Sequence, residues 1–324
     1  MVNWKRGLLL VAATVVGTGK AWAGYTFTTI DVPGAAPGES FGYGISGSSV
    51  AGTYLAAPNY SAHGFVYSNG VFTTIDVPGA NTNVGGYGTN VVGISGSTVV
   101  GYYNGTFGWS GFIESGGVFT TLVEPNAAPG NTFVGGISSD TVIGYYNDLN
   151  QVTHGFSETG GVYTTIDDPF AIRATHPNGI DGNTIVGSYT DAVGRHGFVD
   201  VGGVFTTIDV PGAFPGSTQI GGISGNSMVG TFVNSSGIHG FIDTLGVFTT
   251  IDDSLATTGT FPFGISGNTL SGYYQVGPEV HGFIATLNSV PEPTSLGVGI
   301  AAVTLLVRRR RNGVTLRVLG RTTS

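Results

Sequence analysis

Short apolar and polar runs, separated by Gly, Asn, Ser or Pro, fill the middle of the chain. Runs such as residues 71–76 and 98–103 are rich in β-branched and aromatic side chains. Short runs of this kind, bounded by turn residues, are typical of β-strands. Long stretches rich in Ala, Leu, Glu and Lys, which would favour helices, are absent there. The pattern therefore predicts an all-β domain over residues 24–289.

Four of these runs recur together in six copies, spaced by about 42 to 47 residues. The first is Phe-Thr-Thr-Ile or a variant of it, at residues 25–31, 71–76, 118–122, 162–167, 204–209 and 247–252. The others are Gly-Ile-Ser/Asp, an apolar pair followed by Gly and an aromatic residue, and His-Gly-Phe. Four short strands per repeat fit one blade of a β-propeller. We expect a six-bladed β-propeller of four-stranded antiparallel blades.

The two ends of the array predict how the ring closes. The run at residues 25–31 has no His-Gly-Phe run before it, and the run at residues 281–287 has no Phe-Thr-Thr run after it. Pairing of these N- and C-terminal strands would complete one blade and leave no open ring edge. An open β-solenoid of the same units is the alternative. In either blade phase, the two longer connections lie on one face, which is the candidate binding face.

The recurrent histidines invite a metal-binding or catalytic interpretation. They are His63, His154, His196, His239 and His281, with Ser110 at the equivalent position between the first two of them. Equivalent residues of a ring lie in different blades, too far apart to bind one ion, so we expect each to bond to a neighbouring strand or turn. His176 stands outside the motif and is expected in a loop.

A recurrent aspartate follows the Phe-Thr-Thr-Ile run, at Asp31, Asp76, Asp167, Asp209 and Asp252. We expect its carboxylate to accept backbone N–H groups in an Asx-type turn. Weak Ca²⁺ binding is the alternative, although no EF-hand or nonapeptide loop is present. Acids that could serve a glycosidase stand singly, at Glu39, Asp148, Asp191 and Glu279, and loop aromatics that could stack on sugars are Tyr60, Phe107, Trp109 and Phe214. No catalytic, cofactor-binding or metal-binding residue is assigned.

Charge and cysteine content exclude several functions. Between residues 24 and 293 the only bases are Arg173 and Arg195, whereas all 19 acids lie there. Such a domain repels a phosphate backbone, which excludes nucleic acid as a partner. The chain has no cysteine, which excludes thiolate metal sites and a cysteine nucleophile.

The N-terminal residues 1–23 have the order of a secretory signal peptide. Lys5 and Arg6 precede an apolar run, and Ala21 and Ala23 frame a small-x-small cleavage site before Gly24. The pattern predicts export with cleavage by signal peptidase. An uncleaved membrane anchor is the alternative.

The C-terminal residues 290–311 combine a short motif, an apolar run and a basic cluster. The motif is Val290, Pro291, Glu292 and Pro293, and the cluster is Arg308, Arg309, Arg310 and Arg311. The apolar run at 294–307 predicts a short transmembrane helix with the arginines on the cytoplasmic side. This order resembles the PEP-CTERM sorting signal, which implies processing by an exosortase-type enzyme at the surface of a Gram-negative cell. The basic tail at 312–324 departs from that pattern, and a plain membrane anchor is the alternative.

The repeat itself resembles the HAF-type extracellular repeat family over about residues 25 to 287, with Gly in place of the Ala. That resemblance implies an extracellular repeat protein without a mapped active site. The resulting hypothesis is an exported cell-surface or extracellular-matrix protein with a structural, adhesive or binding role, whose partner is an exopolysaccharide or another surface protein. A secreted carbohydrate-active enzyme is the alternative.

Overall fold

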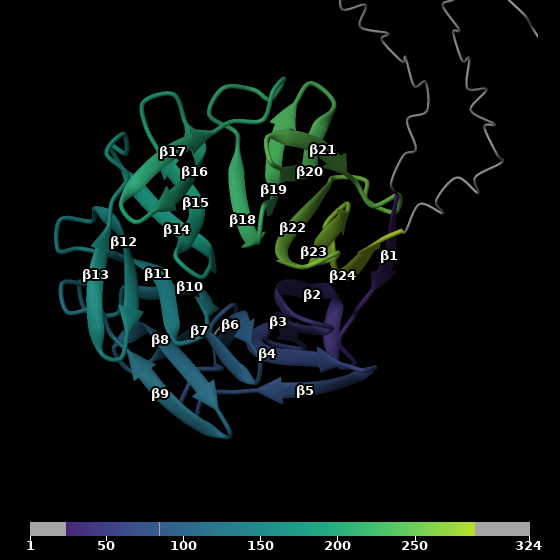
Figure 1. Ribbon diagram of the computed structural model, residues 1–324. Coiled ribbons are helices and arrows are strands. Elements are labelled where there is room, and N and C mark those ends of the chain that lie inside the picture. Colours follow the sequence, from purple (N-terminus) through teal and green to yellow (C-terminus); the bar gives the residue numbers. More distant parts are fainter. Residues whose placement is uncertain (1–23, 84, 289–324) are drawn as a thin grey trace, which may run out of the picture. The chain divides into compact units, whose positions relative to one another are not determined.

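The computed structural model describes residues 24–83 and 85–288, in which every regular element is a β-strand. The strand pairings divide into antiparallel units of four, arranged around a central axis (Figure 1). We call each unit a blade and number the blades 1 to 6 in chain order of their innermost strands. The prediction of an all-β propeller is confirmed.

Each blade uses the four recurrent runs in one order from the axis outwards. The innermost strands carry the Gly-Ile-Ser/Asp run: β2 (Ala35–Ser46), β6 (Thr89–Ser95), β10 (Thr132–Ser138), β14 (Ala174–Asp181), β18 (Gln219–Ser224) and β22 (Gly259–Ser266). The second strands carry the aromatic run: β3 (Ser49–Ala56), β7 (Thr98–Gly105), β11 (Thr141–Asn147), β15 (Thr184–Thr190), β19 (Ser227–Asn234) and β23 (Thr269–Val276).

The third strands carry His-Gly-Phe: β4 (Ser61–Ser68), β8 (Gly108–Ser115), β12 (Thr153–Thr159), β16 (Arg195–Val201), β20 (Gly237–Thr244) and β24 (Glu279–Leu287). The outermost strands carry the Phe-Thr-Thr run: β5 (Val71–Ile75), β9 (Val118–Leu122), β13 (Val162–Ile166), β17 (Val204–Ile208), β21 (Val247–Ile251) and β1 (Tyr25–Thr29). The link after each outermost strand is therefore the one that crosses to the next blade.

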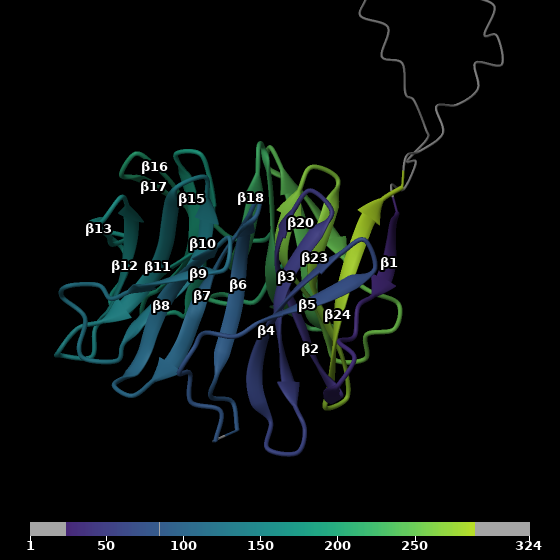
Figure 2. The same ribbon diagram turned by 90° about the horizontal axis from the view of Figure 1, so that it is seen from below.

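The last blade is built from both ends of the array. Strand β1 pairs antiparallel with β24, from Tyr25 opposite Leu287 to Thr29 opposite Phe283. Both ribbon views show the two strands side by side (Figures 1 and 2). The predicted pairing of the first and last strands is confirmed.

The serine or aspartate of the Gly-Ile-Ser/Asp run joins neighbouring blades. Its side-chain oxygen accepts a hydrogen bond from a backbone N–H in the first turn of the next blade. The six bonds are Ser46 to Gly96, Ser95 to Ser139, Ser138 to Gly182, Asp181 to Gly225, Ser224 to Gly267, and Ser266 to Gly47. The last bond connects blade 6 to blade 1, so this network has no gap.

The phenylalanine of His-Gly-Phe forms the centre of each blade. Its six copies, Phe65, Phe112, Phe156, Phe198, Phe241 and Phe283, are at most 1% exposed. The glycine of the neighbouring second strand makes room for each ring, since a Cβ on Gly52 would lie 2.7 Å from the Phe65 ring. Aromatic rings bury a large apolar surface per side chain, so these six residues contribute strongly to the stability of the blades.

The direction of the strands places the two kinds of connection at opposite ends of the blades. Tight hairpins join the first to the second strand and the third to the fourth strand. The link from the second to the third strand and the link to the next blade lie at the other end (Figure 2), which we call the long-connection face. Only the link to the next blade is longer in every blade. The expectation of a second long link is wrong for blades 2, 5 and 6, where two residues join the second strand to the third.

Candidate functional site

Each recurrent histidine is paired with a recurrent aspartate. The Nδ1 atoms lie between 2.8 and 3.2 Å from carboxylate oxygens in the pairs His63–Asp76, His154–Asp167, His196–Asp209, His239–Asp252 and His281–Asp31. The histidine side chains are 12 to 25% exposed, whereas the aspartates are 43 to 49% exposed. We call these units the His–Asp pairs. They lie at the long-connection face, between the third and fourth strands.

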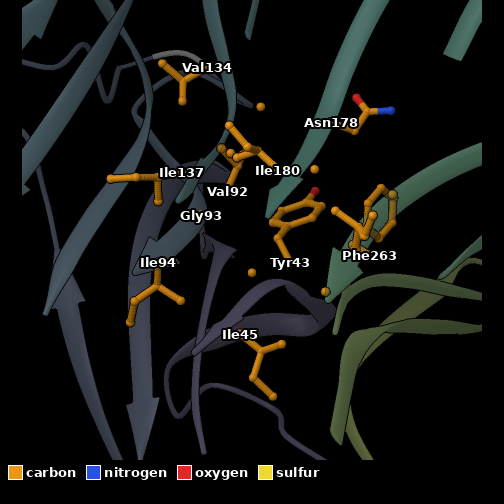
Figure 3. Close-up of a pocket in the computed structure, with 18 of the residues that line it drawn as sticks. Tyr43, Ile45, Val92, Gly93, Ile94, Val134, Ile137, Asn178, Ile180 and Phe263 are labelled. Carbon is orange, nitrogen blue, oxygen red and sulfur yellow. The ribbon is translucent and has the colours of Figure 1, made fainter. Parts of the chain in front are cut away.

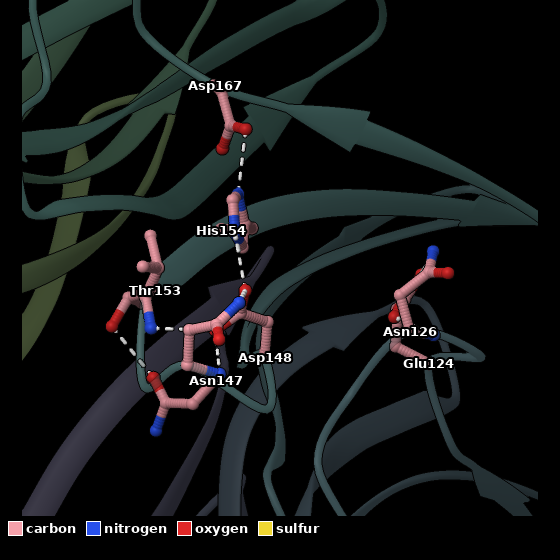
Figure 4. Close-up of polar contacts among 9 residues, drawn as sticks. Glu124, Asn126, Asn147, Asp148, Thr153, His154 and Asp167 are labelled. Atoms are coloured by element: carbon pink, nitrogen blue, oxygen red, sulfur yellow. Dashed lines mark hydrogen bonds and ion pairs between the residues drawn. The ribbon is translucent and has the colours of Figure 1, made fainter.

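The other ring nitrogen of each histidine also faces an acceptor. For His154, Nε2 lies 3.9 Å from Asp148 (Figure 4). The ring stacks on Tyr146 at a centroid distance of 5.3 Å. Asp191 lies 3.3 Å from Nε2 of His196, and Glu279 lies 3.7 Å from that of His281. The rings of His154, His196 and His281 thus each lie between two acidic side chains.

Serine takes the place of the second acid at His63 and His239. Ser61 lies 3.0 Å and Ser236 lies 2.9 Å from the respective Nε2 atoms. Each hydroxyl donates to an asparagine instead, Ser61 to Asn59 and Ser236 to Asn234. Each serine hydroxyl therefore lies between the histidine Nε2 and the Oδ1 of an asparagine.

Blade 2 lacks both partners of the pair. Ser110 replaces the histidine, and the residue thirteen positions later is Val123. Where a second acid is present, at His154, His196 and His281, the two acids flank opposite ring nitrogens and therefore do not converge. Across residues 24–83 and 85–288, no group of three His, Cys, Asp or Glu residues could hold a metal ion. The His–Asp pairs thus join strands within a blade.

The Asx-type turn occurs one residue later than the sequence indicated. In three copies the next position is an acid, whose carboxylate accepts the backbone N–H two residues further on. Asn126 donates to Glu124, Phe170 to Asp168 and Leu255 to Asp253. The recurrent aspartates themselves face the histidine rings, because the end of the outermost strand runs beside the third strand. The expected turn role is corrected accordingly.

One of these histidines has a shifted pKa. Burial opposes the charge of His196, but the hydrogen bond and charge of Asp209, together with the charge of Asp191, outweigh it and raise its pKa. Backbone N–H groups of Gly194 and Val193 lower the pKa of the Asp191 carboxyl, and the charge of His196 lowers it further. When the pH is low enough to protonate His196, its contacts with Asp209 and Asp191 become stronger.

A second candidate site lies on the propeller axis. The six innermost strands enclose a cavity of about 280 Å³ (Figure 3). Six recurrent glycines and six isoleucines form two of its layers: Gly44, Gly93, Gly136, Gly179, Gly222 and Gly264, then Ile45, Ile94, Ile137, Ile180, Ile223 and Ile265. The glycines let the strands meet, since a Cβ on Gly44 would lie 2.8 Å from the Cα of Gly93.

The third layer of the cavity breaks the repeat. The residue before each of these glycines is, in blade order, Tyr43, Val92, Gly135, Asn178, Gly221 and Phe263. Tyr43 and Phe263 are in edge contact at 5.3 Å. Asn178 belongs to blade 4, opposite blade 1, and has a glycine on either side of it in the ring. The cavity therefore has one aromatic wall and one polar group facing it.

Tyrosine hydroxyls from three blades add further polar groups to the cavity. Burial raises the pKa of Tyr43, Tyr102 and Tyr145, so their phenols stay protonated. All three line the cavity. None of these hydroxyls is hydrogen-bonded to another side chain or backbone group in the described part of the chain. Asn178 donates its amide hydrogen to the carbonyl of Ile220 at 2.8 Å, which leaves its oxygen as an acceptor.

His176 lies in a strand and not in the expected loop. It is part of β14, and its ring packs edge-on against Tyr145 at 4.6 Å. Burial, and then the charge of Arg195, lowers the pKa of His176 to about 4. The sequence pattern missed this placement because Pro177 follows, a residue typical of turns, whereas here it occupies a β-bulge of the inner strand.

The candidate loop residues are spread over the long-connection face. Tyr60, Phe107 and Phe214 are exposed by 47%, 87% and 51%. Trp109 instead packs against Tyr102 at 5.5 Å. Of the single acids, Asp148, Asp191 and Glu279 flank the histidines described above, and Glu39 lies at the start of the inner region of β2. The structure thus brings none of these acids together as a carboxylate pair.

Several predicted residues lie outside the described part of the chain. These are Ala21 and Ala23 of the cleavage site, the motif at 290–293, the apolar run and the arginines at 308–311. Gly24 is the first residue that the structure describes. Among the described residues, no helix is long and apolar enough to cross a membrane.

Comparisons with known proteins agree on the fold. No family model and no curated protein matches the chain. A triple arginine-to-alanine variant of AofleA from Arthrobotrys oligospora is similar, with 15% identity, a TM-score of 0.50, and coverage of 81% of this chain and 86% of that one. Aleuria aurantia lectin in complex with alpha-methyl-L-fucoside has 13% identity, a TM-score of 0.48, and coverage of 81% and 97%. At these identities the likeness shows the fold alone.

Proposed function

We propose that this protein is an exported, closed six-bladed propeller that binds a carbohydrate ring in its axial cavity and acts at the cell surface. The observation that carries the proposal is the aromatic wall of Tyr43 and Phe263 opposite Asn178. A sugar ring has an apolar C–H face and a polar edge of hydroxyl groups. Such a ligand suits a mostly apolar pocket with a few placed polar groups.

The size of the cavity limits the ligand. Small-molecule sites have volumes of roughly 300–1,000 Å³, and this cavity has about 280 Å³. It therefore suits one ring rather than an oligosaccharide. The strand direction places the Tyr43 layer towards the long-connection face, so the rest of a polysaccharide chain would leave across that face, where Tyr60, Phe107 and Phe214 are exposed.

Export rests on the two ends of the sequence. Residues 1–23 supply the signal peptide and residues 290–311 the PEP-CTERM-like signal, so signal peptidase and an exosortase-type enzyme are the proposed processing partners. The test is localisation of a tagged protein with and without Pro291, Glu292 and Pro293. Equal surface retention of both forms would refute the sorting proposal.

The binding test uses the purified protein on a glycan array and on immobilised exopolysaccharide. The Tyr43→Ala variant removes half of the aromatic wall and should weaken retention at least tenfold. The control is Tyr60→Ala, which changes an exposed loop aromatic outside the cavity. Retention that survives Tyr43→Ala but not Tyr60→Ala would place binding on the loops instead.

A second candidate function is a carbohydrate-active enzyme. It is favoured by one observation: His176, Asn178 and Gln219 break the repeat in blades 4 and 5 close to the axis. Hydrolysis of a glycosidic bond ordinarily needs two carboxyl groups, whereas none of the described residues that line the cavity is an acid. Incubation with the polysaccharide that the array identifies, followed by a reducing-end assay, decides between the two functions. We expect no new reducing ends.

A further inference from the structure

Arg195 is a fixed cation at the axial end of an acidic domain. In the described residues, Arg173 and Arg195 are the only arginines and lysine is absent. Arg195 begins β16 at the long-connection face, and its Nη1 donates to Oε1 of Gln219 at 2.8 Å. Gln219 begins β18, the innermost strand of the next blade. The hydrogen bond thereby holds the guanidinium at the start of this innermost strand.

This guanidinium has no acidic partner. Although acids greatly outnumber bases in the domain, every ion pair of the described residues within 4.0 Å is formed by a histidine. An arginine carries five N–H donors in a planar fork that matches a carboxylate. Only one of these donors is used, by an uncharged amide. The others are available to a ligand.

Electrostatics connect Arg195 to the lining of the cavity. His176 occupies in β14 the position that Gln219 occupies in β18, and its ring packs against Tyr145. Tyr145 lines the cavity. The charge of Arg195 is felt at both, since it contributes after burial to the low pKa of His176 and counteracts the rise that burial causes in the pKa of Tyr145. His176 stays neutral near pH 7, so the positive charge acting on this part of the cavity is that of Arg195.

We propose that the axial site prefers a sugar ring bearing a carboxylate, of the uronic acid type, and that Arg195 contacts that carboxylate. This inference rests on the proposed binding of a carbohydrate ring in the cavity. The ring would lie against Tyr43 and Phe263, with its hydroxyls near Asn178. The carboxylate would point to the long-connection face, where the guanidinium can bind it in a bidentate manner.

The overall charge restricts this preference to isolated acidic residues. The many acids of the domain repel a polyanion. At physiological ionic strength such repulsion is screened beyond about 8 Å, whereas a direct guanidinium–carboxylate contact persists. The expected ligand is therefore the acidic end or a sparse acidic unit of an otherwise neutral chain.

The experiment is calorimetric titration of the purified protein with methyl glucuronide and, as the matched neutral probe, methyl glucoside. Wild-type protein should bind the glucuronide at least tenfold more tightly. Arg195→Gln should abolish that preference and leave binding of the glucoside unchanged, and Arg195→Lys should give an intermediate preference. Arg173→Gln removes the same charge elsewhere on the face and should leave the preference intact.

Three other outcomes would contradict the proposal. Equal affinity of the wild-type protein for both probes overturns the preference for acidic rings, while the proposed carbohydrate binding stands. Equal losses with Arg173→Gln and Arg195→Gln show a long-range charge effect and overturn the contact. If neither probe binds a protein whose circular dichroism is that of a folded β domain, both proposals are wrong.

Discussion

Nδ1 of His281 lies 3.0 Å from a carboxylate oxygen of Asp31, although the two residues are 250 positions apart. In every other His–Asp pair the partners are 13 positions apart, within one blade's consecutive strands. The geometry of the pair is the same in both cases. The N-terminal strand therefore replaces the missing fourth strand of blade 6 in full local detail, side chains included.

Loss of the Phe27 ring should weaken this closure. Phe27 packs edge-on against Phe283 at 5.1 Å, across the pairing of β1 with β24. Truncation of a large core aromatic costs about 3–5 kcal/mol, and Phe27 is only partly buried. Phe27→Ala should lower the free energy of unfolding by roughly 2–3 kcal/mol, as measured by urea denaturation followed by circular dichroism.

The control for this change is Thr28→Ala on the exposed side of the same strand. It should alter the free energy of unfolding by less than about 0.5 kcal/mol. Equal effects of the two substitutions would mean that β1 does not pack onto blade 6 in solution.

A buried hydroxyl, serine in blade 1 and threonine in the other five, holds each link between blades. Thr89 is 1% exposed, and its Oγ1 accepts a hydrogen bond from the backbone N–H of Val77 at 2.9 Å. Thr89→Val keeps the shape of the side chain but leaves that N–H without a partner. We expect a loss of about 1–3 kcal/mol in the free energy of unfolding, against almost none for Thr120→Val on the exposed edge of β9. Similar values for both would show that water reaches the Val77 amide.

Periodicity in the sequence was sufficient to predict the propeller. The Phe-Thr-Thr and His-Gly-Phe runs each form a strand, and their arrangement at residues 25–31 and 281–287 predicted the closing pair. These features depend on local strand preference and on the repeat, both of which are visible in one chain. The blade phase was left open, because the lengths of the connections alone do not say which link crosses.

The partners within the site could not be predicted from either motif alone. His154 and Asp167 belong to two recurrent motifs, and only the hairpin between them brings them together. The joint change to Ser110 and Val123 in blade 2 was the available signal. The axial cavity could not be predicted for another reason. Tyr43, Asn178 and Phe263 share a position in the repeat, but the residue type at that position varies between copies, so no motif marks it. These side chains face one cavity only once the ring closes.

His176 should make the protein less stable in acid. The unfolded chain binds a proton at this residue near pH 6.5, whereas the folded chain binds it only near pH 4. Between these values the unfolded state carries more protons, so the free energy of unfolding falls as the pH falls. The shift corresponds to roughly 3 kcal/mol. In His176→Gln, which takes the residue found at the equivalent position in β18, this loss should disappear when urea denaturation is compared at pH 7.5 and pH 4.5.

His196 provides a control of opposite sign for that experiment. Its pKa in the folded state is raised, so its contribution is fully present below pH 6.5 and is lost as the pH rises through the folded value. His196→Gln should therefore destabilise the protein more at pH 5 than at pH 8.5. If both variants shift stability in the same direction with pH, the charge environments described for these two histidines are incorrect.

Blade 2 offers a way to rebuild a His–Asp pair. Tyr103 lies opposite Ser110 in the strand register, as Tyr146 lies opposite His154, and its hydroxyl lies 3.2 Å from Thr121. The aromatic platform for a histidine is thus already present. We expect Ser110→His together with Val123→Asp to form the pair, whereas each single change places one polar group without a partner on a partly exposed surface and has little effect.

A double-mutant cycle measures this pair directly. The coupling energy should be favourable by about 0.5–1 kcal/mol, the range for exposed ion pairs. It should be larger at pH 5.5 than at pH 8.5, because protonation of the new histidine adds charge to the hydrogen bond. A coupling of zero at both pH values would show that the pairs in the other blades result from strand placement and contribute nothing to holding the strands together.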